Sequence, residues 1–291
     1  MSYRALFFLV SANVLGGASY LATAYALKGF SDTGLVFWRT ALGVPFFLPI
    51  LARRVKGLDL SPEDWLRVAA VGILGYAAPL LVGTAGQRLS TATNASLLIG
   101  VEPVAIVLLS AVFLGEMMTV LKTTAIALGL AGSSLIVLQA WPWDAQLTPR
   151  LKGDALLFLH GVLWALFSVI GKPVLRKVDS LTFTALAIVF ALAALALSAL
   201  AGLDVGHLRV SGQALLAVSF LAIGVTFLGT LAWSKGLEMV PASKLACFVF
   251  LQPLVGVLLG SLWQGEAFTA WSASGGVLIL LGALAASRDE A

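Results

Sequence analysis

Charged residues are scarce in this chain, and their scarcity excludes an ordinary soluble domain. Only 11% of the 291 residues are Asp, Glu, Lys or Arg, whereas soluble domains average about 25%. Hydrophobic residues make up 60% of the chain, and the mean hydropathy is +1.00. Water therefore cannot be the main solvent, and we predict a membrane protein.

Cysteine and the common catalytic motifs are also missing or nearly so. The single cysteine, Cys247, excludes an internal disulfide and any CxxC metal or redox motif. We interpret it as a small buried hydrophobic side chain. The sequence contains no GxxxxGK[ST], HExxH or GxSxG motif, so neither ATP hydrolysis nor an obvious hydrolase chemistry is supported. We expect no enzyme activity, no metal and no cofactor. The sequence has no basic, aromatic-rich patch outside the predicted membrane segments, so nucleic-acid binding is not supported either.

Long apolar runs are what the chain has in abundance. About 20 apolar residues span the hydrocarbon core as a helix, and these runs are continuous instead of alternating as in a membrane β-barrel. The first run resembles a signal sequence but is longer and lacks a clear cleavage site. We predict an all-α integral membrane protein with ten transmembrane helices, at roughly 4–27, 33–52, 65–86, 91–114, 118–139, 153–175, 181–202, 211–235, 241–264 and 268–287.

An internal repeat divides the chain into two halves. Residues 83–136 align with 233–286 without a gap when 150 is added to each number. The polar and structural matches carry the alignment: Gly86 with Gly236, Pro103 with Pro253, Glu116 with Glu266, and Gly132 with Gly282. Such duplication is typical of secondary transporters, whose substrate sites lie between the repeats. We predict a first five-helix repeat at 1–140, a linker loop at 141–152 and a second five-helix repeat at 153–291.

The number of helices in each half predicts the relative orientation of the repeats. Because five is odd, the second half begins on the opposite side of the membrane, and the repeats are inverted. If the N-terminus is cytoplasmic, the inner loops hold 12 of the 18 Lys and Arg residues and the outer loops hold 6. This distribution follows the positive-inside rule and predicts that both termini are cytoplasmic.

Two prolines occupy matching positions near the centres of the predicted fourth and ninth helices. Pro103 and Pro253 each remove one backbone hydrogen bond and are expected to kink their helix at an equivalent depth. A kink that serves packing alone remains an alternative. The pairing favours a hinge or a cavity wall.

These features together resemble a known family. A central proline followed by an apolar stretch and Gly-Glu occurs twice, and Trp38-Arg39 lies in the second helix. This pattern is similar to the EamA-type branch of the drug/metabolite transporter superfamily, most like the YddG-type exporters of aromatic and other amino acids. The resemblance implies one central cavity lined by the first four helices of each half, with the fifth and tenth helices peripheral. It implies a multi-pass protein of the cell inner membrane that exports amino acids or similar small metabolites. We expect a monomer. The alternative is a multidrug exporter of lipophilic cations.

Helical spacing suggests which side chains face that cavity, since residues three or four apart share a face. Trp164 and Tyr76 are candidates for stacking against a substrate side chain. The same stripes of small, aromatic and polar residues are also typical of close helix packing in lipid, so that interpretation stays open. The full set of candidate substrate-binding residues is Asn13, Tyr20, Tyr76, Asn94, Glu102, His160 and Trp164.

Four charged residues have distinct predicted roles. Glu102 lies next to Pro103 near mid-membrane, where a carboxylate is costly and should face the bundle interior. Proton coupling, a structural hydrogen bond and an anchor for a substrate amino group all remain possible for it. Glu116 and Glu266 are predicted to cap the helices that follow them. Arg39 is predicted to be a structural partner of helix ends or of an acidic group near the outer boundary.

Overall fold

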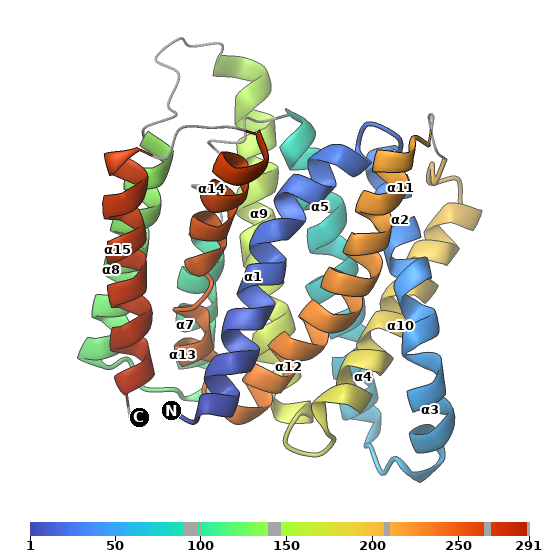
Figure 1. Ribbon diagram of the computed structural model, residues 1–291. Coiled ribbons are helices and arrows are strands. Elements are labelled where there is room, and N and C mark those ends of the chain that lie inside the picture. The colour runs from blue at the N-terminus through green and yellow to red at the C-terminus, as the bar shows by residue number, and fades with distance from the viewer. Residues whose placement is uncertain (90–97, 99, 139–146, 207–209, 265–268, 290–291) are drawn as a thin grey trace.

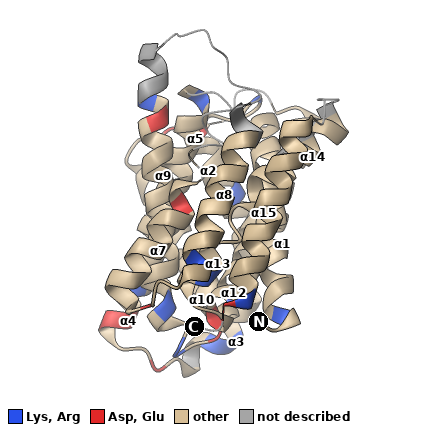
Figure 2. Cartoon of the chain, turned by 90° about the vertical axis from the view of Figure 1, so that its left-hand side faces the viewer, with Lys and Arg blue, Asp and Glu red and all other residues tan. Residues whose placement is uncertain are grey.

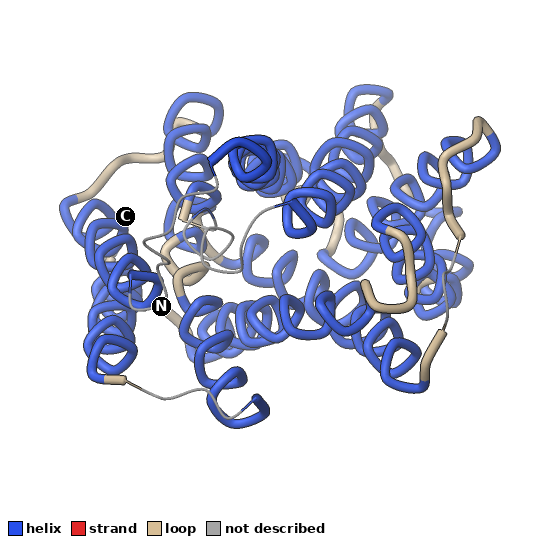
Figure 3. Tube along the Cα trace, turned by 90° about the horizontal axis from the view of Figure 1, so that it is seen from above, coloured by secondary structure: helices blue, strands red, loops and turns tan. Residues whose placement is uncertain are grey.

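The computed structural model of the chain describes residues 1–89, 98, 100–138, 147–206, 210–264 and 269–289. Every regular element in these ranges is helical, and none of the described residues forms an extended strand (Figure 3). Helices of the first half are α1 (Tyr3–Ala26), α2 (Asp32–Gly43), η1 (Val44–Phe46), α3 (Leu48–Arg54), η2 (Val55–Gly57), α4 (Pro62–Gly72), η3 (Ile73–Ala77), α5 (Ala78–Leu89), α7 (Val101–Leu114) and α8 (Val120–Leu138).

The second half continues in the same style. Its helices are α9 (Leu147–Val174), α10 (Ser180–Leu200), α11 (Gly212–Phe220), η4 (Leu221–Gly229), α12 (Thr230–Met239), α13 (Ala242–Ala246), α14 (Leu251–Gln264) and α15 (Ala270–Arg288). Polar caps explain several starts. Asp179 accepts hydrogen bonds from the backbone N–H groups of Leu181 and Thr182 at the start of α10, which satisfies donors that the helix leaves free.

The helices form a bundle with one pair set to the side. Helix α8 packs against α15, and both stand at the left edge of the view in Figure 1. In the main bundle, α1 packs on α12, α14 and η4, while α9 packs on α5 and α7. Contacts between α1 and α14, and between α7 and α9, join residues from opposite halves of the chain. The core of the bundle is therefore shared by both halves.

Two helical rods contain π-helical segments at matching positions. Segment η3 interrupts the rod α4–α5, and η4 interrupts the rod α11–α12. Adding 150 to the bounds of η3 gives 223–227, which lies inside η4. A π-helix widens the turn and exposes backbone groups, and such segments frequently occur at functional sites. The repeat detected in the sequence thus extends to local backbone geometry.

The lengths and polarity of the helices fit a membrane protein. Among the described residues, seven helices are long and apolar enough to cross a membrane, and α2 with α3, bent by 50°, makes an eighth if counted as one span. Helix α7 and the stretch Val120–Leu135 of α8 are apolar but shorter. Most charged residues lie toward the two ends of the bundle (Figure 2). Both termini lie at the same end (Figure 1).

The two prolines that were expected to kink helices both lie in the first turn of a described helix. Pro103 is the third residue of α7, and Pro253 is the third residue of α14. Before α14 the chain breaks: α13 ends at Ala246, and turns follow to Phe250. Proline is tolerated in a first helical turn because its missing N–H would have no partner there anyway. Pro253 therefore directly follows a break inside the candidate span Ala242–Trp263, and Pro103 lies in the first turn of α7 as described.

Candidate functional site

A cavity lies between the two halves of the bundle. The cavity volume is about 110 Å³. A single water molecule needs about 10–15 Å³ by the same measure. The cavity therefore has room for a small organic molecule. Both halves contribute walls. The lining residues are Ala12, Gly16, Ser19, Tyr20, Thr23, Arg39, Tyr76, Leu80, Gly83, Thr84, Gln87, Glu102, His160, Trp164, Val225, Gly229, Thr230, Trp233 and Gln252.

The cavity reaches away from the end that holds both termini. Along α1, which starts at that end (Figure 1), the lining runs from Ala12 to Thr23. The earlier residues Ala5 and Leu9 are buried in the hydrophobic core instead. The cavity therefore occupies the part of the bundle beyond the first third of α1.

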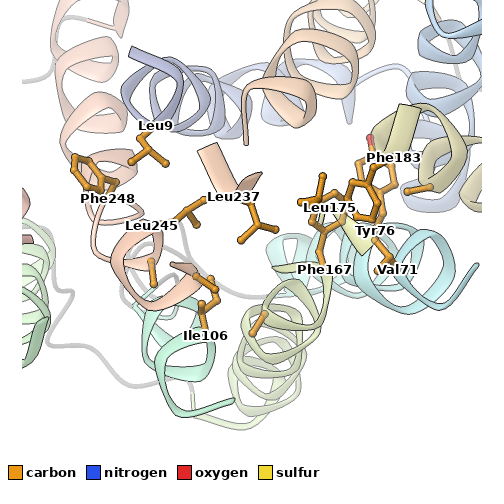
Figure 4. Close-up of a cluster of buried hydrophobic side chains, with 14 of the residues drawn as sticks. Leu9, Val71, Tyr76, Ile106, Phe167, Leu175, Phe183, Leu237, Leu245 and Phe248 are labelled. Carbon is orange, nitrogen blue, oxygen red and sulfur yellow. The ribbon is translucent and has the colours of Figure 1, made fainter. Parts of the chain in front are cut away.

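A hydrophobic plug fills the bundle on the side of the termini. We define the plug as Leu9, Ile106, Leu237, Leu245 and Phe248, each no more than 1% exposed. Figure 4 shows these side chains grouped together from α1, α7, α12, α13 and the turn after α13. Because they come from both halves and exclude water, they close this end of the cavity.

A carboxylate latch reinforces the plug. Glu116, just after α7, accepts hydrogen bonds from the backbone N–H groups of Ala242 and Ser243 at 2.8 Å each, and from Ser243 Oγ at 2.6 Å. Glu116 was predicted to cap the helix that follows it in sequence. The structure corrects this: it caps α13, which belongs to the other half. Its repeat counterpart Glu266 lies outside the described residues.

Five of the seven predicted site residues line the same cavity. They are Tyr20, Tyr76, Glu102, His160 and Trp164. Asn13 is fully buried beside the cavity, where its Oδ1 accepts a hydrogen bond from Gln252 Nε2 at 3.0 Å. Asn94 lies outside the described residues.

Aromatic rings form one wall. The ring of Trp164 meets that of Tyr76 edge-on at 5.7 Å between centroids, and that of His160 at 6.2 Å. His160 Nδ1 lies 2.6 Å from the carbonyl oxygen of Pro79, to which a protonated Nδ1 donates. Gly83 makes room for this arrangement, because a Cβ there would overlap the imidazole ring. The wall is thus a fixed apolar surface with one polar edge.

Glu102 differs in its hydrogen bonding from the other polar groups of the cavity. Its side chain is buried, with 8% of the residue exposed. In the part of the chain that the structure describes, no hydrogen bond or ion pair reaches its carboxylate. Its repeat counterpart Gln252, by contrast, bonds to Asn13 and accepts from Tyr20 Oη at 3.4 Å. The symmetric scaffold thus carries an asymmetric pair of side chains.

Arg39 corrects a second expectation. The sequence suggested a structural partner of helix ends near the outer boundary, but Arg39 lines the cavity and is 6% exposed. Its Nε donates to Thr226 Oγ1 at 3.3 Å, and no acidic side chain pairs with it within the described ranges. A buried guanidinium without a carboxylate partner is costly in a membrane and marks a functional position.

Sequence reasoning missed Arg39, Trp233 and Thr226, although the repeat held a signal for the last. Tyr76 Oη donates to Thr226 Oγ1 at 2.8 Å, and these two residues are 150 positions apart, which is the shift between the repeats. A residue that touches its own counterpart lies near the axis relating the repeats. Applying the shift of 150 to Tyr76 would have identified Thr226.

The architecture defines a class of protein. Apolar helices of membrane length enclose a cavity between two related halves, closed at one end by a plug and a latch. The described residues contain no group of three or more His, Cys, Asp or Glu side chains suited to a metal ion. This is the construction of a multi-pass membrane protein that holds a small molecule between its repeats.

The family is shown directly by sequence comparison. The model of the EamA-like transporter family matches residues 3–138 and 151–288. The chain belongs to this family and is a membrane-embedded transporter of small molecules, not an enzyme.

Relatives cover nearly the whole chain. "Uncharacterized transporter YyaM" of Bacillus subtilis (strain 168) is 25% identical over 284 residues, 96% of this chain and 92% of its own. "Probable terminal-alkyne amino-acid exporter" of Streptantibioticus cattleyicolor is 25% identical over 290 residues, 98% and 94% of the two chains. A solved structure, described as "Crystal structure of protein", superposes with a TM-score of 0.83 at 24% identity and 99% coverage of both chains, which supports the fold alone.

Proposed function

We propose that this chain is a secondary transporter that exports amino acids or similar small metabolites across the cell inner membrane by alternating access. The observation that carries the proposal is the cavity between the halves, lined by aromatic rings, an arginine and a glutamate, and closed at one end. One relative carries the name of a probable amino-acid exporter, which agrees with this substrate class.

The proposed topology has ten membrane-spanning rods in two inverted repeats, in a monomer. The repeats are residues 1–140 and 153–291, joined by the linker 141–152, whose last six residues already belong to α9. This number is supported by joining the described helices that are separated only by π-segments or short breaks. Both termini are placed in the cytoplasm, supported by the excess of basic residues on that side and by the position of both termini at one end (Figure 1). The plug then closes the cytoplasmic end, and the cavity faces outward.

Alternating access follows from the same arrangement. Substrate entering from the cytoplasm requires the plug to separate and the opposite end of the bundle to close. In inverted repeats an exchange of conformations between the halves achieves both at once. The latch from Glu116 to Ala242 and Ser243 crosses between the halves, so it must break in each cycle. Pro103 and Pro253, at the starts of α7 and α14, are the proposed hinges.

The substrate-binding residues proposed are Asn13, Tyr20, Tyr76, Asn94, Glu102, His160 and Trp164. Trp164 and Tyr76 supply the surface for an apolar or aromatic side chain. His160 and the amide-bearing residues supply hydrogen bonds to the polar end of the substrate.

The direct test is transport by purified protein in proteoliposomes. Labelled aromatic, aliphatic and basic amino acids are offered one at a time, with and without an imposed pH gradient. We expect uptake of at least one amino acid, saturable and faster than in protein-free vesicles. Transport of no member of the panel would refute the proposed substrate class.

Coupling to protons is proposed through Glu102. Burial disfavours the charged form of a carboxyl group, so this one is suited to exchanging a proton as its surroundings change. In Glu102→Gln, amino-acid exchange between equal solutions is expected to persist in part, while uptake driven by the pH gradient is lost. Unchanged proton flux together with normal transport in this variant would remove Glu102 from coupling.

Export of lipophilic cations is the second candidate, and the unpartnered carboxylate of Glu102 is the observation in its favour. Arg39 in the same cavity opposes it, since a buried guanidinium repels cations at short range. A competition experiment separates the two candidates. Quaternary ammonium compounds should inhibit transport if the protein is a cation exporter, and they should not inhibit it if the protein is an amino-acid exporter.

A further inference from the structure

Two opposite charges line the cavity without forming an ion pair. Arg39 on α2 is 6% exposed and Glu102 on α7 is 8% exposed, yet both border the cavity. No salt bridge joins either of them to another residue in the described ranges. Buried membrane charges normally pair with one another. Here both remain unpaired and face the same space.

Arg39 keeps most of its hydrogen-bonding capacity free. A guanidinium carries five N–H donors in a planar fork. Its Nε donates to Thr226 Oγ1, and the hydroxyl of Tyr76, which donates to the same oxygen, also interacts with the guanidinium. These contacts hold the side chain in place and leave the remaining N–H donors of the fork for a ligand. A planar fork suits the two oxygens of a carboxylate.

Glu102 lines the cavity from α7 and lies close enough to Tyr20 for an electrostatic interaction between the two side chains. The amide of its repeat counterpart Gln252 is occupied by Asn13 and by the Tyr20 hydroxyl, so neighbouring polar groups are already paired. Some described side-chain atoms are fully buried and also lack a hydrogen-bond partner, but the two carboxylate oxygens of Glu102 are not among them. Its carboxylate is therefore open to the cavity and suits an ammonium group.

We propose that Arg39 and Glu102 bind the two charged groups of an α-amino acid zwitterion, with the substrate carboxylate on Arg39 and the substrate ammonium on Glu102. The side chain of the substrate then lies against the aromatic wall at Tyr76 and Trp164. This inference rests on the proposed function. It adds Arg39 as a residue that determines specificity, and it adds a requirement for the charges of the substrate. A substrate needs both charges, because an amine leaves Arg39 unpaired and a simple acid leaves Glu102 unpaired.

The experiment measures competition against transport of labelled L-phenylalanine in proteoliposomes at neutral pH. Two competitors each lack one charge: phenylethylamine has no carboxylate, and 3-phenylpropionate has no ammonium. Against wild-type protein, both should bind about 10- to 100-fold more weakly than unlabelled L-phenylalanine, the loss of one charge-assisted contact. If the amino-acid panel favours alanine or leucine, the corresponding amine and acid replace these probes.

Substitutions then assign each charge. In Arg39→Gln, the advantage of phenylalanine over phenylethylamine should fall about tenfold or more, and Arg39→Lys should keep part of it. In Glu102→Gln, the advantage over 3-phenylpropionate should fall instead. Arg53→Gln removes an exposed cation on α3, away from the cavity lining, and should change neither ratio. These ratios do not depend on how much protein is correctly folded.

The outcomes separate the two proposals. If the wild type transports amino acids but the amine and the acid compete equally well, or if Arg39→Gln leaves the ratio unchanged, the zwitterion site is wrong and the proposed function stands. If the wild type transports no amino acid of the panel, the proposed function is wrong, and the zwitterion site falls with it.

Discussion

Replacing Glu116 should open the plugged end of the bundle. Its carboxylate accepts three hydrogen bonds from the other half of the chain, two from backbone N–H groups and one from Ser243 Oγ. In Glu116→Gln, the charge is lost and the amide nitrogen can no longer accept. A hydrogen bond to a charged group contributes about 1.5–3 kcal/mol. Because each 1.4 kcal/mol is a factor of ten, the open fraction should rise about 10- to 100-fold.

The native chain contains its own reporter of this opening. Cys247, the only cysteine of the sequence, is 2% exposed and adjoins Phe248 of the plug. In detergent, its rate of alkylation by N-ethylmaleimide should follow the population in which the plugged end is open. We expect the rate to increase from wild type through Ser243→Ala, which loses only the hydroxyl contact, to Glu116→Gln and then Glu116→Ala.

The control is Glu63→Gln, which neutralises an exposed carboxylate on α4 paired with Arg67. It removes the same charge without touching the latch, and it should leave the labelling rate unchanged. If a well-folded Glu116→Ala protein is labelled at Cys247 at the wild-type rate, the proposed role of the latch is refuted. An equal acceleration in Glu63→Gln would show that net charge, not the latch, governs access to Cys247.

Three further predictions concern packing, capping and substrate contact. Gly83→Ala places a methyl group into the His160 ring and should cost about 1–3 kcal/mol, seen as a lower Tm, whereas Gly57→Ala, with open space around it, should change little. Burial alone would raise the pKa of Asp179, but hydrogen bonds from Thr182 and the nearby Arg54 outweigh it and lower the pKa. Asp179→Ala should therefore lower the free energy of unfolding by about 1 kcal/mol at pH 7. This difference between wild type and variant should disappear as the pH falls below about 3.9. A difference that does not change with pH would contradict the capping role. Trp164→Ala should weaken phenylalanine transport about 2- to 12-fold and alanine transport less, and equal losses would argue against ring contact.

The sign of the Asp179 prediction follows from linkage. A carboxyl whose pKa is lowered by folding stabilises the folded state at pH values above its unfolded pKa. That contribution is lost as the pH falls through the lowered value, because the folded state must then take up a proton. Thermal unfolding of wild type and variant between pH 7 and pH 3 measures this difference directly.

Sequence patterns were sufficient for the class of protein and for much of the cavity. Apolar runs of membrane length, with few charges, leave the helix as the structure that satisfies its own backbone in lipid. Residues at helical spacing on predicted faces included Tyr76, His160 and Trp164, which all border the cavity. Periodicity succeeds here because a cavity between helices collects the polar and aromatic residues of each inner face.

Tertiary structure decided how the cavity closes and which charges enter it. Arg39 and Glu116 were both read from the sequence as local features of their own helices, but each acts across the bundle, on Thr226 and on Ala242 and Ser243. Those partners are 187, 126 and 127 positions away along the chain. Local propensity carries no information about such distances. The sequence by itself determined helices, membrane and repeat; only the packing of one repeat on the other decided the plug, the latch and the two unpaired charges.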